Sequence, residues 1–427
     1  MTASKTLKNA GWLIGCRIIQ SILSFVVSSL TARYLGPSNF GTINYAISLA
    51  AFFAPLVSLG LNSTLVQEVV AKPDKEGESI GTALGLNVAS AIFCIIGLNS
   101  FVAVSSAGET ETILVCSLYS VTLLAQGMEI IQYWFQAKLL SKYTAVIGII
   151  AYTFASAYKI CLLITDKSVY WFAISNALDY SIIAISLILV YRKVGTQKLR
   201  FSMERAKQML SISKHYIVSN MMVTVFGQIA NIFLRHMIDD TAVGFYSAAI
   251  SCAMITNFVF AAVIDSARPS ILQARKEDFF VFERNIKRLY SVVIYLALAQ
   301  SVVICLLSKV IVNIVYGANF SPTAAILRIL IWYTPFSYIG PVRDIWILAE
   351  GKQSIMWIIN SMGAIISIVF NMFFISFWGI NGAAIACLMT QLFTNVILGC
   401  ILPPIRHNNE LILSSLNPKY IISLMKR

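Results

Sequence analysis

The sequence has little charge for its length. Only 12% of its 427 residues are Asp, Glu, Lys or Arg, whereas 58% are hydrophobic and the mean hydropathy is +0.77. Soluble globular proteins carry about 25% charged residues, so this composition argues against a large soluble core and indicates a polytopic membrane protein. The net charge of +13 lies in short loops between apolar segments. Membrane orientation explains it better than a nucleic-acid partner does.

Residues suited to metal binding and catalysis are also scarce. The eight Cys lie in apolar runs without a CxxC pair, and the three His are scattered, which argues against a disulfide framework and a zinc site. The sequence has no GxxxxGK[ST], no HExxH and no credible Ser–His–Asp set. We therefore expect a protein that is not an enzyme and has no cofactor. Its energy source would be an ion gradient (H⁺ or Na⁺) or the gradient of its substrate.

Long apolar runs dominate what is present. A helix needs about 20 residues to cross about 30 Å of hydrocarbon, and twelve runs reach that length. We therefore expect an all-α polytopic membrane protein with about twelve transmembrane helices. They cover residues 9–34, 40–67, 80–104, 111–137, 143–164, 168–191, 214–236, 242–264, 288–316, 322–348, 354–377 and 380–402.

Lys and Arg indicate how these helices are oriented. If the N-terminus is cytoplasmic, 24 of the 32 Lys and Arg residues fall on the cytoplasmic side. Three fall on the opposite side: Arg33, Lys167 and Arg235. Cytoplasmic loops carry the excess of positive charge in membrane proteins, so we expect an even number of helices with both termini in the cytoplasm.

A repeat divides the chain into two halves. The pattern of a glycine, four residues and Ala-Ile-Ser-x-Ala occurs at Gly41 and again 203 residues later at Gly244. Six helices precede the longest basic loop, so the two halves would have the same orientation, as in some alternating-access transporters. The predicted organisation is an N-lobe at 1–192, a basic cytoplasmic linker at 193–213, a C-lobe at 214–403 and a cytoplasmic tail at 404–427.

The first helix of each half carries a polar stripe at helical spacing. Arg17, Ser21, Ser24 and Ser28 correspond to Asn220, Thr224, Gly227 and Asn231 at the same offset, and Asn62 corresponds to Asp265. Small polar residues in membrane helices often only join neighbouring helices by hydrogen bonds. Because stripes recur in both halves, we expect a shared wet cavity. The candidate substrate-binding residues with neutral side chains are Asn62, Asn220, Gln228 and Asn231.

Ionisable residues inside the spans are rarer and more informative, because a charge at the centre of the bilayer costs about 3 kcal/mol on insertion scales. Lys159 and Lys309 lie near the outer surface and can extend toward it. A buried structural role is the alternative reading for every candidate, and Arg343 could simply pair with adjacent Asp344. The cationic candidates for substrate binding are Arg17, Arg235, Arg328 and Arg343. The candidates for ion coupling are Asp179, Glu129 and Asp265.

The stretch ARYLGPSNFGTINYA (Ala32 to Ala46) resembles the Wzx-type oligosaccharide flippases. These form the polysaccharide biosynthesis branch of the multidrug/oligosaccharidyl-lipid/polysaccharide (MOP) exporter superfamily. The preceding NAGWLIG and the later IVYGANFSPTAAILRIL (Ile314 to Leu330) are similar to that family as well. The resemblance covers essentially the whole chain and implies a V-shaped alternating-access transporter of MATE-like fold with two six-helix lobes. It does not specify the sugar.

The resemblance also implies a substrate and a location. The substrate would be an undecaprenyl-diphosphate-linked oligosaccharide, such as an O-antigen repeat unit for lipopolysaccharide. The protein would move it from the cytoplasmic to the periplasmic leaflet of the bacterial inner membrane. A polysaccharide polymerase and a chain-length regulator are the implied partners, beside the membrane lipids and the lipid-linked substrate. Arg17 is the first candidate for binding the diphosphate.

Three other functions remain as alternatives. A cation-coupled multidrug exporter of the same superfamily would need acidic and aromatic cavity residues rather than several Arg. A flippase for the peptidoglycan lipid precursor would share the chemistry but commonly has more than twelve helices. A membrane-embedded glycan polymerase or ligase would need a large periplasmic loop, whereas every outward loop predicted here is short.

Overall fold

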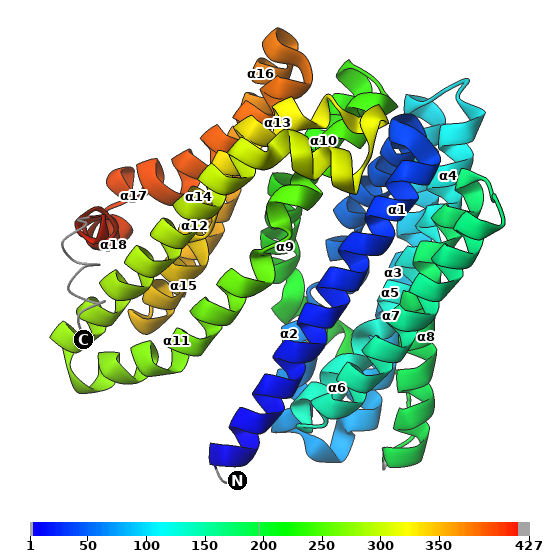
Figure 1. Ribbon diagram of the computed structural model, residues 1–427. Helices are drawn as coiled ribbons and strands as arrows, with labels where there is room; N and C mark the ends of the chain where they lie inside the picture. Colours follow the sequence, from blue (N-terminus) through cyan, green and yellow to red (C-terminus); the bar gives the residue numbers. More distant parts are fainter. Residues whose placement is uncertain (1–2, 196, 417–427) are drawn as a thin grey trace. The chain divides into compact units, whose positions relative to one another are not determined.

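The computed structural model describes residues 3–195 and 197–416; the side chains of residues 3–19 and of residue 215 lie outside the described part. Figure 1 shows that the described chain consists of helices and their connections. The α-helices are α1 (Ala3–Ser58), α2 (Leu61–Ala71), α3 (Glu76–Ser105), α4 (Thr110–Ser120), α5 (Thr122–Met128), α6 (Gln132–Ala137), α7 (Ser141–Ile164), α8 (Val169–Val194), α9 (Met203–Met237), α10 (Asp240–Met254), α11 (Asn257–Glu277), α12 (Phe279–Val315), α13 (Thr323–Leu330), α14 (Thr334–Ser337), α15 (Ile339–Ala349), α16 (Met356–Leu392), α17 (Leu398–Ile401) and α18 (Pro403–Ser415). The short 3₁₀-helices are η1 (Pro73–Lys75), η2 (Glu129–Ile131), η3 (Ala318–Phe320), η4 (Ile331–Tyr333) and η5 (Gln353–Ile355), and η6 (Phe393–Ile397) is a π-helix.

The described residues hold 8 helical stretches long and apolar enough to cross a membrane, or up to 9 when the bent pair α10–α11 counts as one span. The stretches Gln20–Ala71 and Gln353–Ile401 have 52 and 49 residues. At 1.5 Å per residue, each is more than twice as long as one crossing of about 30 Å requires. Each holds two of the predicted crossings, and α13 to α15 cover another. The fold is therefore that of a multi-pass membrane protein with about twelve spans, as predicted.

Glycines break both long stretches. Gly36 has φ 75° and ψ 172° within α1, and Gly379 has φ 56° and ψ −134° within α16. Positive φ is readily adopted only by glycine, and Pro37 after Gly36 lacks an N–H to continue the helical hydrogen bonds. The Leu-Gly-Pro turn recognised in the sequence is therefore the point at which α1 bends.

Large apolar side chains cover much of the described surface. Phe93 on α3, Leu306 on α12 and Phe377 on α16 are 75%, 75% and 68% exposed. Monomeric soluble proteins rarely expose large contiguous apolar surfaces, whereas a lipid-facing surface must be apolar. Exposed apolar residues on several of the long helices therefore agree with a multi-pass membrane protein.

By internal packing the chain forms two compact units, which divide between Ile232 and Phe233 within α9. The first unit has an apolar core in which residues of α2, α3, η2, α6, α8 and the start of α9 meet, including Leu65, Trp134, Tyr191 and Met209. The predicted boundaries of the lobes and linker stay a prediction. The core assigns the first part of α9 to the same unit as α1 to α8.

The predicted linker is docked on the first unit. Gln197 Nε2 donates to the carbonyl of Pro73 at 3.0 Å, and its Oε1 accepts from the backbone N–H of Gly77 at 3.0 Å. The backbone N–H of Arg200 donates to the carbonyl of Gly77 at 3.2 Å. The side chain of Arg205, at the start of α9, donates to Glu68 Oε2 on α2 at 2.7 Å. These contacts fix the beginning of α9 against α2 and α3.

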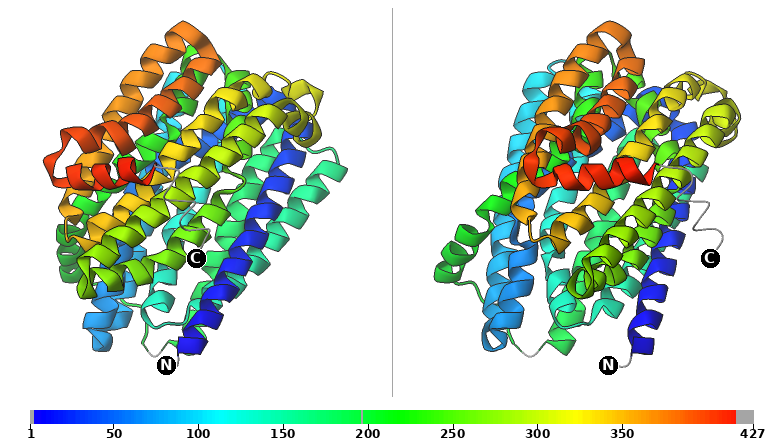
Figure 2. Two further views of the ribbon diagram at one scale, coloured as in Figure 1. Left: turned by 60° about the vertical axis from the view of Figure 1, so that its left-hand side comes forward. Right: turned by 90° about the vertical axis from the view of Figure 1, so that its left-hand side faces the viewer.

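In the second unit, a core around Phe260, Tyr290 and Trp346 joins α11, α12 and α15. Figure 2 shows α18, drawn in red, running across the longer helices of this unit. Tyr290 Oη on α12 donates to Asn408 Oδ1 on α18 at 2.9 Å, and Ser291 Oγ donates to the carbonyl of Ser415 at 2.7 Å. The first part of the predicted tail is therefore an ordered helix held against α12.

Candidate functional site

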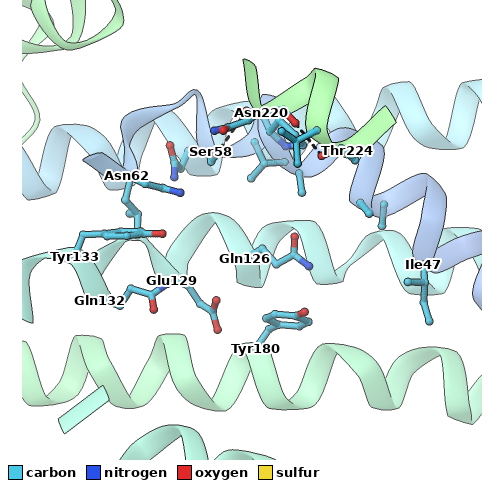
Figure 3. Close-up of a pocket in the computed structure, with 18 of the residues that line it drawn as sticks. Ile47, Ser58, Asn62, Gln126, Glu129, Gln132, Tyr133, Tyr180, Asn220 and Thr224 are labelled. Atoms are coloured by element: carbon cyan, nitrogen blue, oxygen red, sulfur yellow. Dashed lines mark hydrogen bonds between the residues drawn. The ribbon is translucent and has the colours of Figure 1, made fainter. Parts of the chain in front are cut away.

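The first unit contains a polar cavity of about 550 Å³. Its walls come from the second half of α1 and from α2, α3, α4, α5, η2, α6, α8 and α9. Figure 3 shows Gln126, Glu129 and Tyr180 beside one another, with Asn62 and Tyr133 farther along the same space. Carboxylate, amide and hydroxyl groups thus converge in the middle of a largely apolar bundle.

Local breaks in the helices expose these polar groups. Glu129 begins the 3₁₀ turn η2, which separates α5 from α6 inside the apolar stretch Thr110–Ala137. A 3₁₀ turn within a helix changes its hydrogen-bond pattern and often marks a functional hinge or strain. Glu129, a candidate for ion coupling, lines this cavity, and its coupling role stays a prediction. Asn62 and Asn220, both candidates for substrate binding, line the same cavity.

A second cavity of about 350 Å³ lies in the same unit. Ile47, Tyr119 and Tyr180 line both cavities and form the wall between them. Among its polar lining residues are Ser24 and Ser28 of α1, Tyr152, Ser156 and Lys159 of α7, and Asn176 and Asp179 of α8. Figure 1 places α1, α7 and α8 side by side, and they pack directly on one another.

The second cavity contains a lysine next to the predicted ion-coupling residue. Lys159 Nζ donates to Asn176 Oδ1 at 2.8 Å, and Asn176 Nδ2 donates to the carbonyl of Phe172 at 3.0 Å. Asp179 Oδ1 accepts from the backbone N–H of Tyr180 at 2.9 Å. Lys159 and Asp179 both line this cavity. Lys159 is directed inward, although the sequence suggested that it could extend to the outer surface.

Two candidates on α9 take part in helix packing. Ser48 Oγ on α1 donates to Gln228 Oε1 at 2.9 Å, and Asn231 Nδ2 donates to Ser48 Oγ at 2.9 Å. All three residues belong to the first unit. These contacts match the alternative reading of the polar stripe, in which small polar groups join neighbouring membrane helices. Substrate binding by Gln228 and Asn231 stays a prediction.

The remaining candidates lie in the second unit, apart from Arg17. Arg235 Nε lies 2.6 Å from Asp240 Oδ1, and exposed Arg328 donates through Nε to Ser308 Oγ at 2.8 Å. Exposed Asp265 lies 3.5 Å from the guanidinium of Arg268. Each of these charged groups therefore has a polar neighbour in its own unit. Arg17 is on α1, but its side chain lies outside the described residues.

Arg343 has the most enclosed position of the candidates in the second unit. Its side chain is buried, and Nη1 donates at 3.0 Å both to the carbonyl of Thr394 and to Asn395 Oδ1. Thr394 and Asn395 belong to the π-helix η6, where the normal helical hydrogen bonds are displaced. Nη2 also contacts Asp344 Oδ1 at 3.4 Å. These contacts favour a structural role, in which Arg343 satisfies the altered backbone of η6.

Sequence reasoning missed several lining residues. Gln126, Tyr133 and Tyr180 line the larger cavity, and Asn176 with Tyr152 lines the smaller one. Asn176 precedes Asp179 by three residues and therefore shares its helix face. That spacing was the one available signal. The tyrosines could not be distinguished by pattern from the other aromatic residues of an apolar helix.

Comparison with known proteins places the chain in a family. A family model described as polysaccharide biosynthesis protein matches residues 6–275. The capsular polysaccharide biosynthesis protein CapF of Staphylococcus aureus is 21% identical over 397 residues, covering 90% of this chain and 96% of CapF. The succinoglycan biosynthesis transport protein ExoT of Rhizobium meliloti (strain 1021) is 29% identical over 101 residues, 24% of this chain and 20% of ExoT.

Solved structures share the fold at low sequence identity. The lipid II flippase MurJ in an inward closed conformation matches with a TM-score of 0.77 at 13% identity, over 97% of this chain and 93% of that chain. An inward-facing multidrug resistance transporter of the MATE family matches with a TM-score of 0.67 at 14% identity, over 93% and 96%. The predicted MATE-like fold is confirmed. Because the family model matches well over half of its length, the chain belongs to the polysaccharide biosynthesis protein family and has the multi-pass fold of the MOP superfamily.

Proposed function

We propose that this protein is a flippase for an undecaprenyl-diphosphate-linked oligosaccharide, a repeat unit of a surface polysaccharide. It would move this lipid from the cytoplasmic to the periplasmic leaflet of a bacterial inner membrane, with both of its own termini in the cytoplasm. The family match over residues 6–275 carries the proposal. The names of CapF and ExoT, which concern capsule biosynthesis and succinoglycan transport, support a polysaccharide as cargo.

The physical chemistry of the cargo explains why a protein is needed. A diphosphate carries negative charge, and a glycan presents many hydroxyl groups. Moving unpaired charge into hydrocarbon costs far more than burying a neutral polar group, and each unpaired hydroxyl adds a cost of a few kcal/mol. Polar helix faces in a transport path would replace the lost water, while the polyprenyl tail remains among the lipids. Polar residues such as Asn62, Gln126 and Asn220, gathered in one cavity, suit such a path.

Arginines are the proposed ligands of the diphosphate, since a guanidinium can donate two parallel hydrogen bonds to a phosphate. Arg17 is the first candidate. Arg235 offers a way to link binding to movement, because its contact with Asp240 could exchange for the diphosphate. A ligand shifts a conformational equilibrium only when it binds the two states differently. An arginine paired with a carboxylate in one state and with cargo in the other would provide that difference.

Ion coupling is assigned in this proposal to the cavities of the first unit. Glu129 and Asp179 are carboxylates in otherwise apolar stretches, and each lines a cavity. Acidic residues in such positions are typical of proton or cation pathways. Uptake of a cation there would favour one conformation over the other in an alternating-access cycle. A polymerase and a chain-length regulator would then use the translocated repeat unit.

Accumulation of the substrate in cells tests the proposal. Cells that lack the protein should accumulate a polyprenyl-diphosphate oligosaccharide in the cytoplasmic leaflet, identified by mass spectrometry of extracted lipids with a protection assay. The intact gene should relieve the accumulation, and an Arg17→Ala variant that inserts normally should not. If no such lipid accumulates and drug tolerance changes instead, the protein is a multidrug exporter and the proposal is wrong.

A further inference from the structure

The second cavity of the first unit is lined by a lysine of the chain itself. Lys159 is one of the residues that line this cavity of about 350 Å³, together with Asn176 and Asp179. Its Nζ donates to Asn176 Oδ1 at 2.8 Å, and the carboxylate of Asp179 lines the same cavity. The stretch that carries Lys159, Ser141–Ile164, is otherwise apolar enough to span the membrane.

Without Lys159, the other polar groups would form a site for a small hard cation. Asp179 provides a carboxylate, Asn176 an amide oxygen, and Ser24, Ser28 and Tyr152 hydroxyl oxygens. Hard cations prefer such oxygen ligands. The half-buried carboxylate of Asp179 needs a positive partner, because unpaired charge within the membrane is costly. The Lys159 ammonium meets that need at the place where a free cation would bind.

We propose that Lys159 is the resident cation of this cavity and excludes Na⁺ and other metal cations from the Asn176–Asp179 site. The inference rests on the proposed function, because it concerns which ion can couple to transport. A second positive charge beside the ammonium would be repelled, and a cation entering would have to displace the hydrogen bond to Asn176. Protons are then the cations that the cavity can exchange with its surroundings.

The neighbouring titratable groups fit this assignment. Tyr119 on α4, Tyr152 on α7 and Tyr180 on α8 face the cavity beside Lys159 and Asp179. Glu129 lies in the adjoining cavity, beyond the wall that Tyr119 and Tyr180 share. Described residues of α1 contribute hydroxyl groups, the amide of Asn44 and apolar groups to this lining, and no ionisable side chain. Among the described residues, no group of three or more His, Cys, Asp or Glu could hold a metal ion.

Direct binding of ²²Na⁺ to the purified full-length protein tests the inference without any transport assay. Wild type and Lys159→Arg should bind no Na⁺ saturably, because both retain a cation in the cavity. Lys159→Met, which keeps the length and apolar stem of the side chain, should acquire saturable Na⁺ binding. Asp179→Asn in the Lys159→Met background should abolish it. Lys309→Met is the matched control, since Lys309 is an exposed lysine of the apolar helix α12 outside this cavity.

Saturable Na⁺ binding by wild type that Asp179→Asn removes would overturn the inference. So would a Lys159→Met variant that remains monodisperse, melts cooperatively and binds no more Na⁺ than Lys309→Met. Should Lys159→Met fail to fold, Lys159→Gln carries the same expectation. The binding result is independent of the accumulated lipid in cells. If the flippase proposal is wrong, the lipid extract will lack the accumulated oligosaccharide. If this inference is wrong, the Na⁺ binding of the variants will differ from the expected pattern.

Discussion

At the residue scale, two arginines that look alike in the sequence have different surroundings. Arg343 is 7% exposed and satisfies a backbone carbonyl and an amide oxygen of η6. Arg328 is exposed and donates to the hydroxyl of Ser308. Leaving a buried polar group without its partner costs about 1–3 kcal/mol. Removing Arg343 would leave two such groups, whereas removing Arg328 would leave one, the hydroxyl of Ser308. Only the first arginine should therefore matter strongly for stability.

Arg343→Ala should lower the free energy of unfolding by about 3 kcal/mol or more, because breaking a buried ionic and hydrogen-bonded cluster leaves uncompensated groups. Arg328→Ala, the exposed comparison, removes one hydrogen bond to Ser308 and should lower it by about 1 kcal/mol. Melting of the purified variants in one detergent measures both. Equal melting temperatures for the two variants would show that Arg343 does not hold η6 in place.

Glu129 lends itself to a functional test at the same scale. Glu129→Gln keeps the size and hydrogen-bonding capacity of the side chain but removes its ability to carry and release a proton. Transport should fall on the order of tenfold or more, equivalent to at least about 1.4 kcal/mol, with normal amounts of protein in the membrane. Glu111→Gln is the control, because Glu111 is exposed in the first turn of α4. Undiminished transport by Glu129→Gln would exclude a coupling role.

How far the sequence predicted these sites differs from residue to residue. Glu129 and Asp179 stand out as candidates because a carboxylate in an apolar stretch is conspicuous, and both line cavities. Their role in ion coupling stays a prediction. The inward direction of Lys159 was not predictable, since a lysine near a helix end can equally extend to the membrane surface. Its hydrogen bond to Asn176 depends on the packing of α7 against α8, which pattern alone does not determine.

At the scale of elements, the segment before α9, residues 197–202, packs against the beginning of α3. We call this segment the strap. Gly77, Gly81 and Gly85 are spaced by four and lie on one face of the helix. A Cβ added at Gly81 would lie 2.5 Å from the carbonyl oxygen and 2.6 Å from the backbone nitrogen of Arg200. Only glycine lets the two backbones approach so closely. This segment belongs to the basic linker predicted at 193–213, and the structure docks it on the first unit.

Gly81→Ala should therefore destabilise the protein by about 1–3 kcal/mol, because the overlap is with backbone and forces the strap to shift. Gly227→Ala is the matched control, because Gly227 is an exposed residue of α9 and nothing lies within 4 Å of a Cβ added there. Alanine favours a helix interior by up to about 1 kcal/mol over glycine, so this variant should be neutral or slightly more stable. Limited proteolysis between residues 195 and 203 gives a local readout. If the protease cleaves this segment as slowly in Gly81→Ala as in Gly227→Ala, the close contact at Gly81 does not hold the strap in place.

Helix boundaries were predictable where the hydrophobic pattern alone decided them. The Leu-Gly-Pro turn at Gly36 separates the first two predicted spans, as the backbone at Gly36 confirms. The interruptions at η2 and η6 were not predicted. Both lie inside continuous apolar runs, and their conformation follows from contacts such as that of Arg343 with Thr394. Local sequence carries no signal for a break that distant residues stabilise.

At the scale of the whole molecule, the charge distribution predicts how the protein lies in the membrane. Single cysteines can be introduced at Asp166 and at Lys193, in a background without the native cysteines. The first should react with an impermeant thiol reagent added outside intact cells, and the second only after permeabilisation, because basic loops remain in the cytoplasm. The opposite labelling pattern would invert the topology and with it the proposed direction of transport.

The most direct test of the central claim is movement of the lipid in a purified system. Vesicles would contain the protein and the polyprenyl-diphosphate oligosaccharide extracted from cells that lack it, and an external glycosidase would digest what reaches the outer leaflet. Protein-free vesicles should protect about half of the lipid indefinitely. In vesicles with the protein, nearly all of the lipid should be digested, because transport moves the inner-leaflet lipid to the outer leaflet. Digestion should be faster under a proton gradient. If the protected half persists with well-incorporated protein present, the protein does not flip this lipid.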